Sequence, residues 1–154
     1  MTTGPATGPA TDRFRVRRDV VPGVDAVLAE SDRCFARHTH DQFGVGVILD
    51  GAQLSASGRG QVVGEAGDVI TVNPGEVHDG AAIGGRARRW SMLYFAPDLV
   101  AAYGAEIGEG RWGAREFDRP VVSDRHLAGQ VRSLIAAMEA GDGPGDGPGA
   151  FAAS

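Results

Sequence analysis

The sequence predicts a mainly β protein, a single small barrel or sandwich followed by two α-helices. The chain has 24 glycines and 8 prolines among its 154 residues, whereas glycine makes up roughly 7% of an average protein. Such a composition indicates many tight turns, and short alternating apolar segments recur between them. Helical patterns begin only after residue 96. A chain of this length forms one domain with a substantial core.

Seven segments have the pattern of half-buried strands, with an apolar residue at every second position. Dipeptides such as Asp50-Gly51 and Pro74-Gly75 separate them. These pairs supply the backbone conformations that reverse a chain between antiparallel strands, so we expect hairpins rather than crossovers. The predicted strands are Phe14–Arg17, Val24–Ala29, Phe43–Leu49, Ala52–Ser57, Gln61–Val63, Val69–Asn73 and Arg88–Phe95.

Two helices are predicted after the last strand. Pro97 is a favourable first helical residue, and Gly104 is expected to end the first helix after Tyr103. The second helix should have Ser123 as its N-cap and end at Gly141. Its apolar stripe either packs on the protein's own barrel or forms the interface of a homodimer. The predicted interface residues are Leu127, Val131, Leu134, Ile135 and Met138.

These patterns predict a simple domain organisation. Residues 1–12 are expected to be a disordered N-terminal tail, because glycine and proline recur there without periodicity. Residues 13–96 form the barrel, and residues 97–140 a helical dimerisation appendage. Residues 141–154 contain the repeat GDGPGDGPG and are expected to be a linker or tail.

Composition excludes several classes of protein. The net charge is −5 and all 15 basic residues are arginine, which argues against a free-standing nucleic-acid-binding protein. Cys34 is the only cysteine, so no intramolecular disulfide can form. No apolar run approaches the roughly 20 residues that cross a bilayer. Because the N-terminus also lacks the features of a signal peptide, we expect a cytoplasmic protein without membrane contact.

Three histidines are the most informative residues. His38 and His40 are two positions apart, so in a strand they would point to the same face, and a hairpin-rich barrel can bring His78 beside them. Three converging imidazoles can coordinate a divalent metal such as Zn, Ni, Mn or Fe and leave positions open for a ligand. Two alternatives remain: neutral hydrogen-bonding groups of a pocket, or partly exposed residues without a special role.

The segments that contain these histidines, HTHDQFGVGVILDG and GDVITVNPGEVH, resemble the two signature motifs of the cupin superfamily. The first motif keeps the paired histidines and Gly51, but Gly44 stands where the family has a glutamate ligand. In the second, Gly67, Gly75 and His78 keep the family's spacing, although proline directly precedes Gly75. The resemblance implies a double-stranded β-helix, or jelly-roll barrel, in which one expected metal ligand is absent.

A more specific resemblance is to AraC-type transcription regulators. NPGEVHDG, the strand RWSMLYFAP, a short helix and FDRPVV before the last helix occur in the order typical of their sensor domains, over roughly residues 14–140. The resemblance implies that a small effector binds in the barrel and changes the grip of a C-terminal helix-turn-helix domain on DNA. We expect that DNA-binding domain to lie outside this chain, as in an excised sensor or a truncated gene.

The strand Arg88–Phe95 alternates and so places three large side chains on one face, where they either line a ligand cavity or fill the barrel. Gly44 and Gly46, predicted to lie on the inward face, favour open space. Counting an amide beside the second histidine, the predicted ligand-binding residues are His38, His40, Gln42, His78, Trp90, Met92 and Tyr94.

Charged residues near the motifs have less specific interpretations. Glu76 and Asp79 flank His78 and either orient its ring or face water in a turn. The arginines at 86, 88 and 89 are most simply a solvated charge cluster, although such a cluster could also bind an anionic effector or contact the missing DNA-binding domain.

Three functions are compatible with these features. The leading hypothesis is a non-enzymatic effector-binding module of a transcription regulator, because binding energy alone can shift a conformational equilibrium. The second is a stand-alone metal-dependent cupin enzyme, for example an iron dioxygenase that uses His38, His40 and His78. The third is a structural dimerisation domain with a sealed core.

Overall fold

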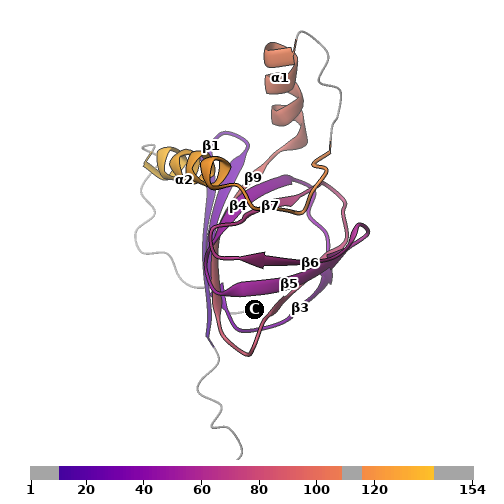
Figure 1. Ribbon diagram of the computed structural model, residues 1–154. Helices are drawn as coiled ribbons and strands as arrows, with labels where there is room; N and C mark the ends of the chain where they lie inside the picture. The colour runs from indigo at the N-terminus through magenta and orange to yellow at the C-terminus, as the bar shows by residue number, and fades with distance from the viewer. Residues whose placement is uncertain (1–10, 109–115, 141–154) are drawn as a thin grey trace, which may run out of the picture.

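The computed structural model describes residues 11–108 and 116–140, which form a barrel of two antiparallel sheets with two helices outside it (Figure 1). Two such sheets facing one another form the jelly-roll architecture that the sequence predicts. The six-stranded sheet has the order β1 (Asp12–Val21), β2 (Val24–Ser31), β9 (Arg88–Phe95), β4 (Phe43–Asp50), β7 (Val69–Val72) and β10 (Val121–Val122). The four-stranded sheet has the order β3 (Phe35–His38), β8 (His78–Ala82), β5 (Ala52–Ser57) and β6 (Gly60–Glu65).

All seven predicted strands are present, and the structure adds β3, β8 and β10. These three have physical reasons to escape prediction. The strand β8 contains glycine and alanines instead of large apolar residues, and β3 has four residues, of which three are exposed. Only two residues form β10, which pairs with the edge of β7. Each therefore lacks the alternation on which strand prediction depends.

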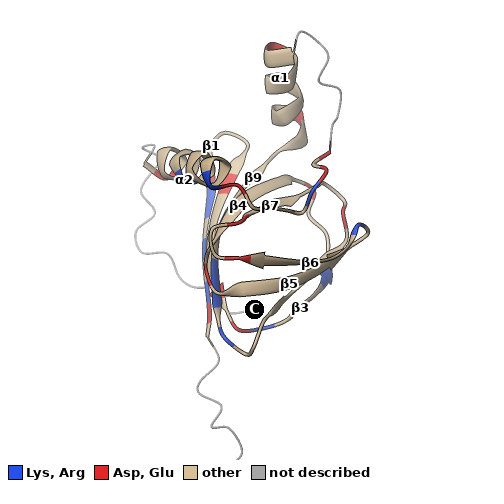
Figure 2. Cartoon of the chain, viewed as in Figure 1, with Lys and Arg blue, Asp and Glu red and all other residues tan. Residues whose placement is uncertain are grey.

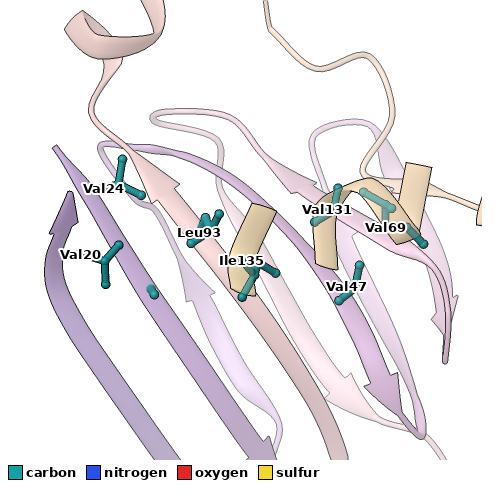
Figure 3. Packing of buried hydrophobic residues seen from close by; sticks show 9 residues of the cluster. Val20, Val24, Val47, Val69, Leu93, Val131 and Ile135 are labelled. Atoms are coloured by element: carbon teal, nitrogen blue, oxygen red, sulfur yellow. The ribbon is translucent and has the colours of Figure 1, made fainter. Parts of the chain in front are cut away.

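The six-stranded sheet buries apolar side chains on both faces. Its outer face packs against α2 (Arg125–Ala140), where Val131 and Ile135 meet residues of five strands (Figure 3). Its inner face forms a smaller cluster around Ile48, Ile70 and Met92. Side chains of a strand alternate between faces, so one strand supplies both clusters: β9 places Leu93 outward and Met92 inward.

The helices depart from the prediction at their ends. The first, α1 (Pro97–Gly108), begins at the predicted proline but continues past Gly104, which is buried inside it. The N-cap of α2 is Asp124, not Ser123: its carboxylate accepts a hydrogen bond from the Leu127 N–H at 3.0 Å. The Ser123 hydroxyl instead donates to the Asp68 carboxylate at 2.7 Å.

The predicted dimer stripe is divided between two environments. Val131 and Ile135 are buried against the protein's own sheet, as the docking interpretation requires. Leu134 is 40% exposed, while Leu127 and Met138 are half-buried at the edge of the same cluster. Homodimerisation stays a prediction, and it now rests on these three residues.

The edge strand β1 is rich in arginine (Figure 2) and ties α2 to the sheet. The Arg17 guanidinium donates to the backbone carbonyl of Glu139 at 2.8 Å, and Arg15 forms an ion pair with the Glu139 carboxylate at 3.4 Å. Cations near the last turn of a helix satisfy its carbonyl groups and dipole. The N-terminal strand and the C-terminal helix are therefore in direct contact.

The predicted tails at residues 1–12 and 141–154, and the predicted helix end at Gly141, lie outside the described residues, with two exceptions. The Thr11 N–H donates to the Asp32 carboxylate at 3.1 Å, and Asp12 is the first residue of β1. Within the described part of the chain, neither helix has the length and hydropathy of a membrane-spanning segment.

Candidate ligand-binding site

A cavity of about 290 Å³ lies between the inner faces of the two sheets. Its size is near the lower limit of the roughly 300–1,000 Å³ typical of small-molecule sites. The lining is mainly apolar and aromatic, with a few polar groups, and contains six of the seven predicted ligand-binding residues. The lining residues used below are Phe14, Phe35, His38, His40, Gln53, Glu76, His78, Asp79, Gly80, Arg88, Trp90, Met92, Tyr94 and Pro120.

The three histidines converge at one end of this cavity. His38 ends β3 and is paired in register with His78 at the start of β8, while His40 follows in the connection to β4. The ring centroids of His38 and His78 are 4.3 Å apart, and those of His40 and His78 are 5.2 Å apart. One nitrogen from each ring lies within 4.8 Å of the others. His38 is exposed and the other two are half-buried, so the cluster stands at a mouth of the barrel.

Backbone carbonyls, not carboxylates, orient two of the rings. The Nδ1 atom of His38 lies 2.8 Å from the Ala36 oxygen, and that of His78 lies 3.1 Å from the Glu76 oxygen. In the tautomer in which Nδ1 donates, Nε2 keeps its lone pair for a metal or a ligand.

The carboxylates of the acidic residues beside His78 bond elsewhere. The carboxylate of Glu76 accepts from Asn73 Nδ2 at 3.1 Å and pairs with Arg59 at 3.6 Å. Asp79 accepts the Ala56 N–H at 2.7 Å.

Burial favours the neutral forms of His40, His78 and Tyr94. Burial lowers the pKa of His40 from 6.5 to about 4, and the neighbouring His78 and His38 lower it further in the same direction. Burial also lowers the pKa of His78 and raises that of the Tyr94 hydroxyl to about 12. Neutral imidazoles are the form that coordinates a metal.

The chemistry of this donor set fits a divalent metal. His38, His40 and His78 would hold it through one imidazole nitrogen each, and these nitrogens lie within 4.8 Å of one another. No fourth protein ligand stands at Gly44, where a cupin glutamate is expected. A Cβ there would lie 2.9 Å from the Tyr94 ring, which covers that position.

Trp90, Met92 and Tyr94 line the cavity from the inner face of β9. The two glycines of β4 make room for these side chains and not for a ligand, which differs from our expectation. A Cβ on Gly44 would meet Tyr94 and Met92, and one on Gly46 would overlap the Ser91 carbonyl oxygen and the Met92 sulfur.

Gln42 does not belong to the cavity lining. Its amide donates to the Asp25 carboxylate at 3.2 Å. The chain bends at Asp41 and Gln42, so strand alternation does not extend from His40 to Gln42.

Arg88 is the lining residue whose role the sequence reasoning missed. Arg86 and Arg89 are exposed as predicted for a solvated cluster, but Arg88 is only 1% exposed. It shares its face of β9 with Trp90, and the same alternation that identified the tryptophan would have placed this arginine in the barrel.

The family model of AraC-like ligand binding domains matches residues 22–150. The cupin domain of Cnp3 from Schizosaccharomyces pombe is 15% identical, with a TM-score of 0.52 over 64% of this chain and 76% of that chain. This similarity shows the fold, and the predicted cupin barrel is confirmed.

Two other solved structures have TM-scores just under this value. A cupin 2 conserved barrel domain protein from Salinispora arenicola CNS-205 is 14% identical, with a TM-score of 0.49 over 62% of this chain and 84% of that chain. KdgF from Halomonas sp. is 17% identical, with a TM-score of 0.47 over 56% of this chain and 82% of that chain. No curated protein matches the chain.

Proposed function

The chain belongs to the family of AraC-like ligand binding domains, and we propose that it is the effector-binding domain of a transcription regulator. A small molecule binds in the barrel cavity and shifts the protein between two conformations without any bond being broken. The observation that carries this proposal is the cavity itself, which aromatic side chains and neutral imidazoles line between the two sheets. A sealed structural core would have no such space.

Two residues of the cavity lining connect the ligand site to β1 and α2, so ligand binding could change the positions of both elements. Phe14 of β1 and Pro120, which leads into β10 and α2, both line the cavity. A ligand between them would change how β1 and the start of α2 sit on the sheet. Because Arg17 of β1 also holds the last turn of α2, the two elements would respond together.

Homodimerisation and DNA binding are further parts of the proposal. The exposed Leu134, with the half-buried Leu127 and Met138, gives α2 an apolar edge that a second subunit could cover. DNA would be contacted through a separate C-terminal helix-turn-helix domain joined through residues 141–154. The net charge of −5 supports leaving DNA contact to another domain.

The histidine cluster favours a second candidate, a metal-dependent cupin enzyme of the three-histidine dioxygenase type. His38, His40 and His78 would hold the metal, which supplies a Lewis-acid centre with open positions when bound. The Tyr94 hydroxyl, with a pKa of about 12, holds its proton at neutral pH and could donate it. Both carboxylates of the lining, Glu76 and Asp79, already accept hydrogen bonds. This leaves the second candidate without an evident base.

A ligand screen with metal analysis distinguishes the two candidates. The purified protein, with and without added metal, is tested for thermal stabilisation by small molecules and for O₂ consumption in their presence. We expect at least one compound to raise the unfolding temperature, since a ligand at 100 times its Kd stabilises by about 2.7 kcal/mol, and no compound to be consumed. Metal-dependent O₂ uptake would establish the enzyme instead, and no stabilisation by any compound would contradict both.

A further inference from the structure

Arg88 is a buried cation with no buried anion beside it. Its side chain lines the cavity, and it forms no ion pair with any of the residues that the structure describes. We propose that Arg88 binds the carboxylate of the effector, so that the ligand is a small organic acid with one anionic group and an apolar body. This inference rests on the proposed function, because it names the class of effector.

Neutral groups hold most of the guanidinium. Its Nη1 donates to the carbonyl oxygens of Ser31 and Arg33 at 3.0 and 2.9 Å, and its Nε lies 3.4 Å from the Gln53 amide oxygen. Phe35 and Trp90 stack near it, with their ring centroids 5.2 and 4.9 Å from the guanidinium carbon. The side chain is therefore fixed in one orientation before any ligand binds, which lowers the entropy that binding would cost.

One nitrogen of the guanidinium remains available. Nη2 makes no hydrogen bond to the part of the chain that the structure describes, and it faces Gly80, another residue of the cavity lining. A Cβ on Gly80 would stand 3.5 Å from Nη2, in ordinary contact. The glycine thus leaves open the side of the arginine on which an anion would sit.

The electrostatics of this environment favour an anionic ligand. Burial lowers the pKa of Arg88, but an arginine stays charged in any protein. Electrostatic attraction to Cys34 and to the Asp32 carboxylate raises the pKa of Arg88, but neither residue forms an ion pair with it. A buried charge without a counter-ion is costly, and a carboxylate ligand would relieve that cost through charge-assisted hydrogen bonds.

The rest of the cavity defines the body of the ligand. Along β9, Arg88 and Tyr94 are six residues apart, or about 20 Å of extended strand, and Trp90 and Met92 lie between them on the same face. Tyr94 reaches the imidazole end, where its ring is 5.0 Å from that of His40. The carboxylates of Glu76 and Asp79 also line the cavity. These would repel a second anionic group, so we expect a monocarboxylate.

The first test compares acids with neutral molecules of the same shape. Hexanoate and 3-phenylpropionate are titrated calorimetrically against hexanamide and 3-phenylpropionamide, and a set of neutral sugars is included. Each titration is run with chelator and repeated in added Zn²⁺ without chelator, so that a carboxylate bound to a metal at the imidazoles is distinguished from one bound to Arg88. We expect the acids to bind at least about tenfold more tightly than their amides, because hydrogen bonds to charged groups are the stronger ones.

Variants then locate the anion. Arg88→Gln should abolish the preference for acids, whereas Arg89→Gln on the exposed face of the same strand should leave it unchanged. Gly80→Asp places a carboxylate beside Nη2 and should block acids while the protein stays folded. Gly80→Asn, which has nearly the same shape without the charge, is its steric control and should bind acids more tightly than Gly80→Asp. If Arg88→Gln does not fold, the comparison of the two Gly80 variants decides whether the anion binds beside Nη2 of Arg88.

The outcomes separate the two proposals. Equal binding of acids and amides, acid binding unchanged in Gly80→Asp, or acid binding that needs added Zn²⁺ would each overturn the role of Arg88 and leave effector binding in place. Binding of neutral sugars alone would also overturn the role of Arg88 and leave effector binding in place. If no acid, amide or sugar binds, the carboxylate proposal fails, and the wider screen decides whether the proposed function fails with it.

Discussion

Trp90 is the residue best placed to report an occupied cavity. Its ring packs edge-on against Phe14 and Phe35, with centroids 6.1 and 6.0 Å away, and all three line the cavity. In a Trp112→Phe background, which leaves a single tryptophan, a ligand that raises the unfolding temperature should also shift or quench the Trp90 emission. A flat emission with every stabilising ligand would remove Trp90 from the binding site.

His40 should make the metal-free protein sensitive to acid. Its pKa is about 4 in the folded protein against 6.5 for an ordinary histidine. Between these pH values the unfolded chain binds more protons at this histidine than the folded protein does. The free energy of unfolding therefore falls as the pH falls through this range, and above pH 6.5 His40 does not make the stability depend on pH.

Urea unfolding of chelator-treated protein across that range measures the effect. His40→Gln should flatten the dependence, whereas His126→Gln at an exposed helix position should not. The same slope in His40→Gln as in the wild type would contradict a neutral buried imidazole.

At this scale the sequence located the residues that lie within a short motif or a regular strand. The histidines were found by their spacing, and Trp90 by alternation. Arg88 was missed because three neighbouring arginines were interpreted together as one solvated cluster, although alternation separates the middle one from the others. The prediction for Gln42 is wrong because strand alternation does not continue past the bend at Asp41 and Gln42, and no residue type there indicates a bend.

The pair β4 and β9 depends on glycine at one position. Gly46 is paired with Met92, and a side chain at 46 would overlap the Ser91 carbonyl oxygen and the Met92 sulfur. Gly46→Ala should therefore lower the free energy of unfolding by about 1–3 kcal/mol, the usual cost of overpacking.

Chemical denaturation measures this loss. Gly58→Ala is the matched control, because no heavy atom lies within 4 Å of a Cβ there. Equal stabilities of the two variants would show that the strands can separate to admit the methyl group.

The helix α2 should join two subunits through its exposed edge. Leu134→Glu places a charge on the 40%-exposed leucine and should convert a dimer to a monomer at micromolar concentration. Ser133→Glu, on the neighbouring exposed position, should leave the mass unchanged. Sedimentation velocity measures both, and an unchanged mass for Leu134→Glu would exclude this edge as the interface.

Elements with strong apolar periodicity could be predicted, and those without it could not. The strand β9 and the stripe of α2 are long and regular. The short β3 and β8, which carry His38 and His78, are held by pairing with one another and have no pattern of their own. The start of α2 was assigned one residue early because Ser123 and Asp124 are both good caps, and only tertiary contacts decide between them.

The whole molecule depends on one sheet that is apolar on both faces. Its outer face carries the main core beneath α2, so the inner face need not be filled and can enclose a cavity. The fold class followed from turn residues, alternation and the resemblance of the motifs. The size of the cavity could not be predicted, because it depends on which side chains lie across the glycines of β4.

A crystal structure with the compound that stabilises the protein most will show whether the effector binds inside the barrel. We expect electron density for the whole ligand inside the barrel, with one end beside Arg88 and its body against Trp90. Density at the surface instead, or a barrel interior closed by its own side chains with the ligand bound elsewhere, would contradict the assignment of this cavity as the effector site.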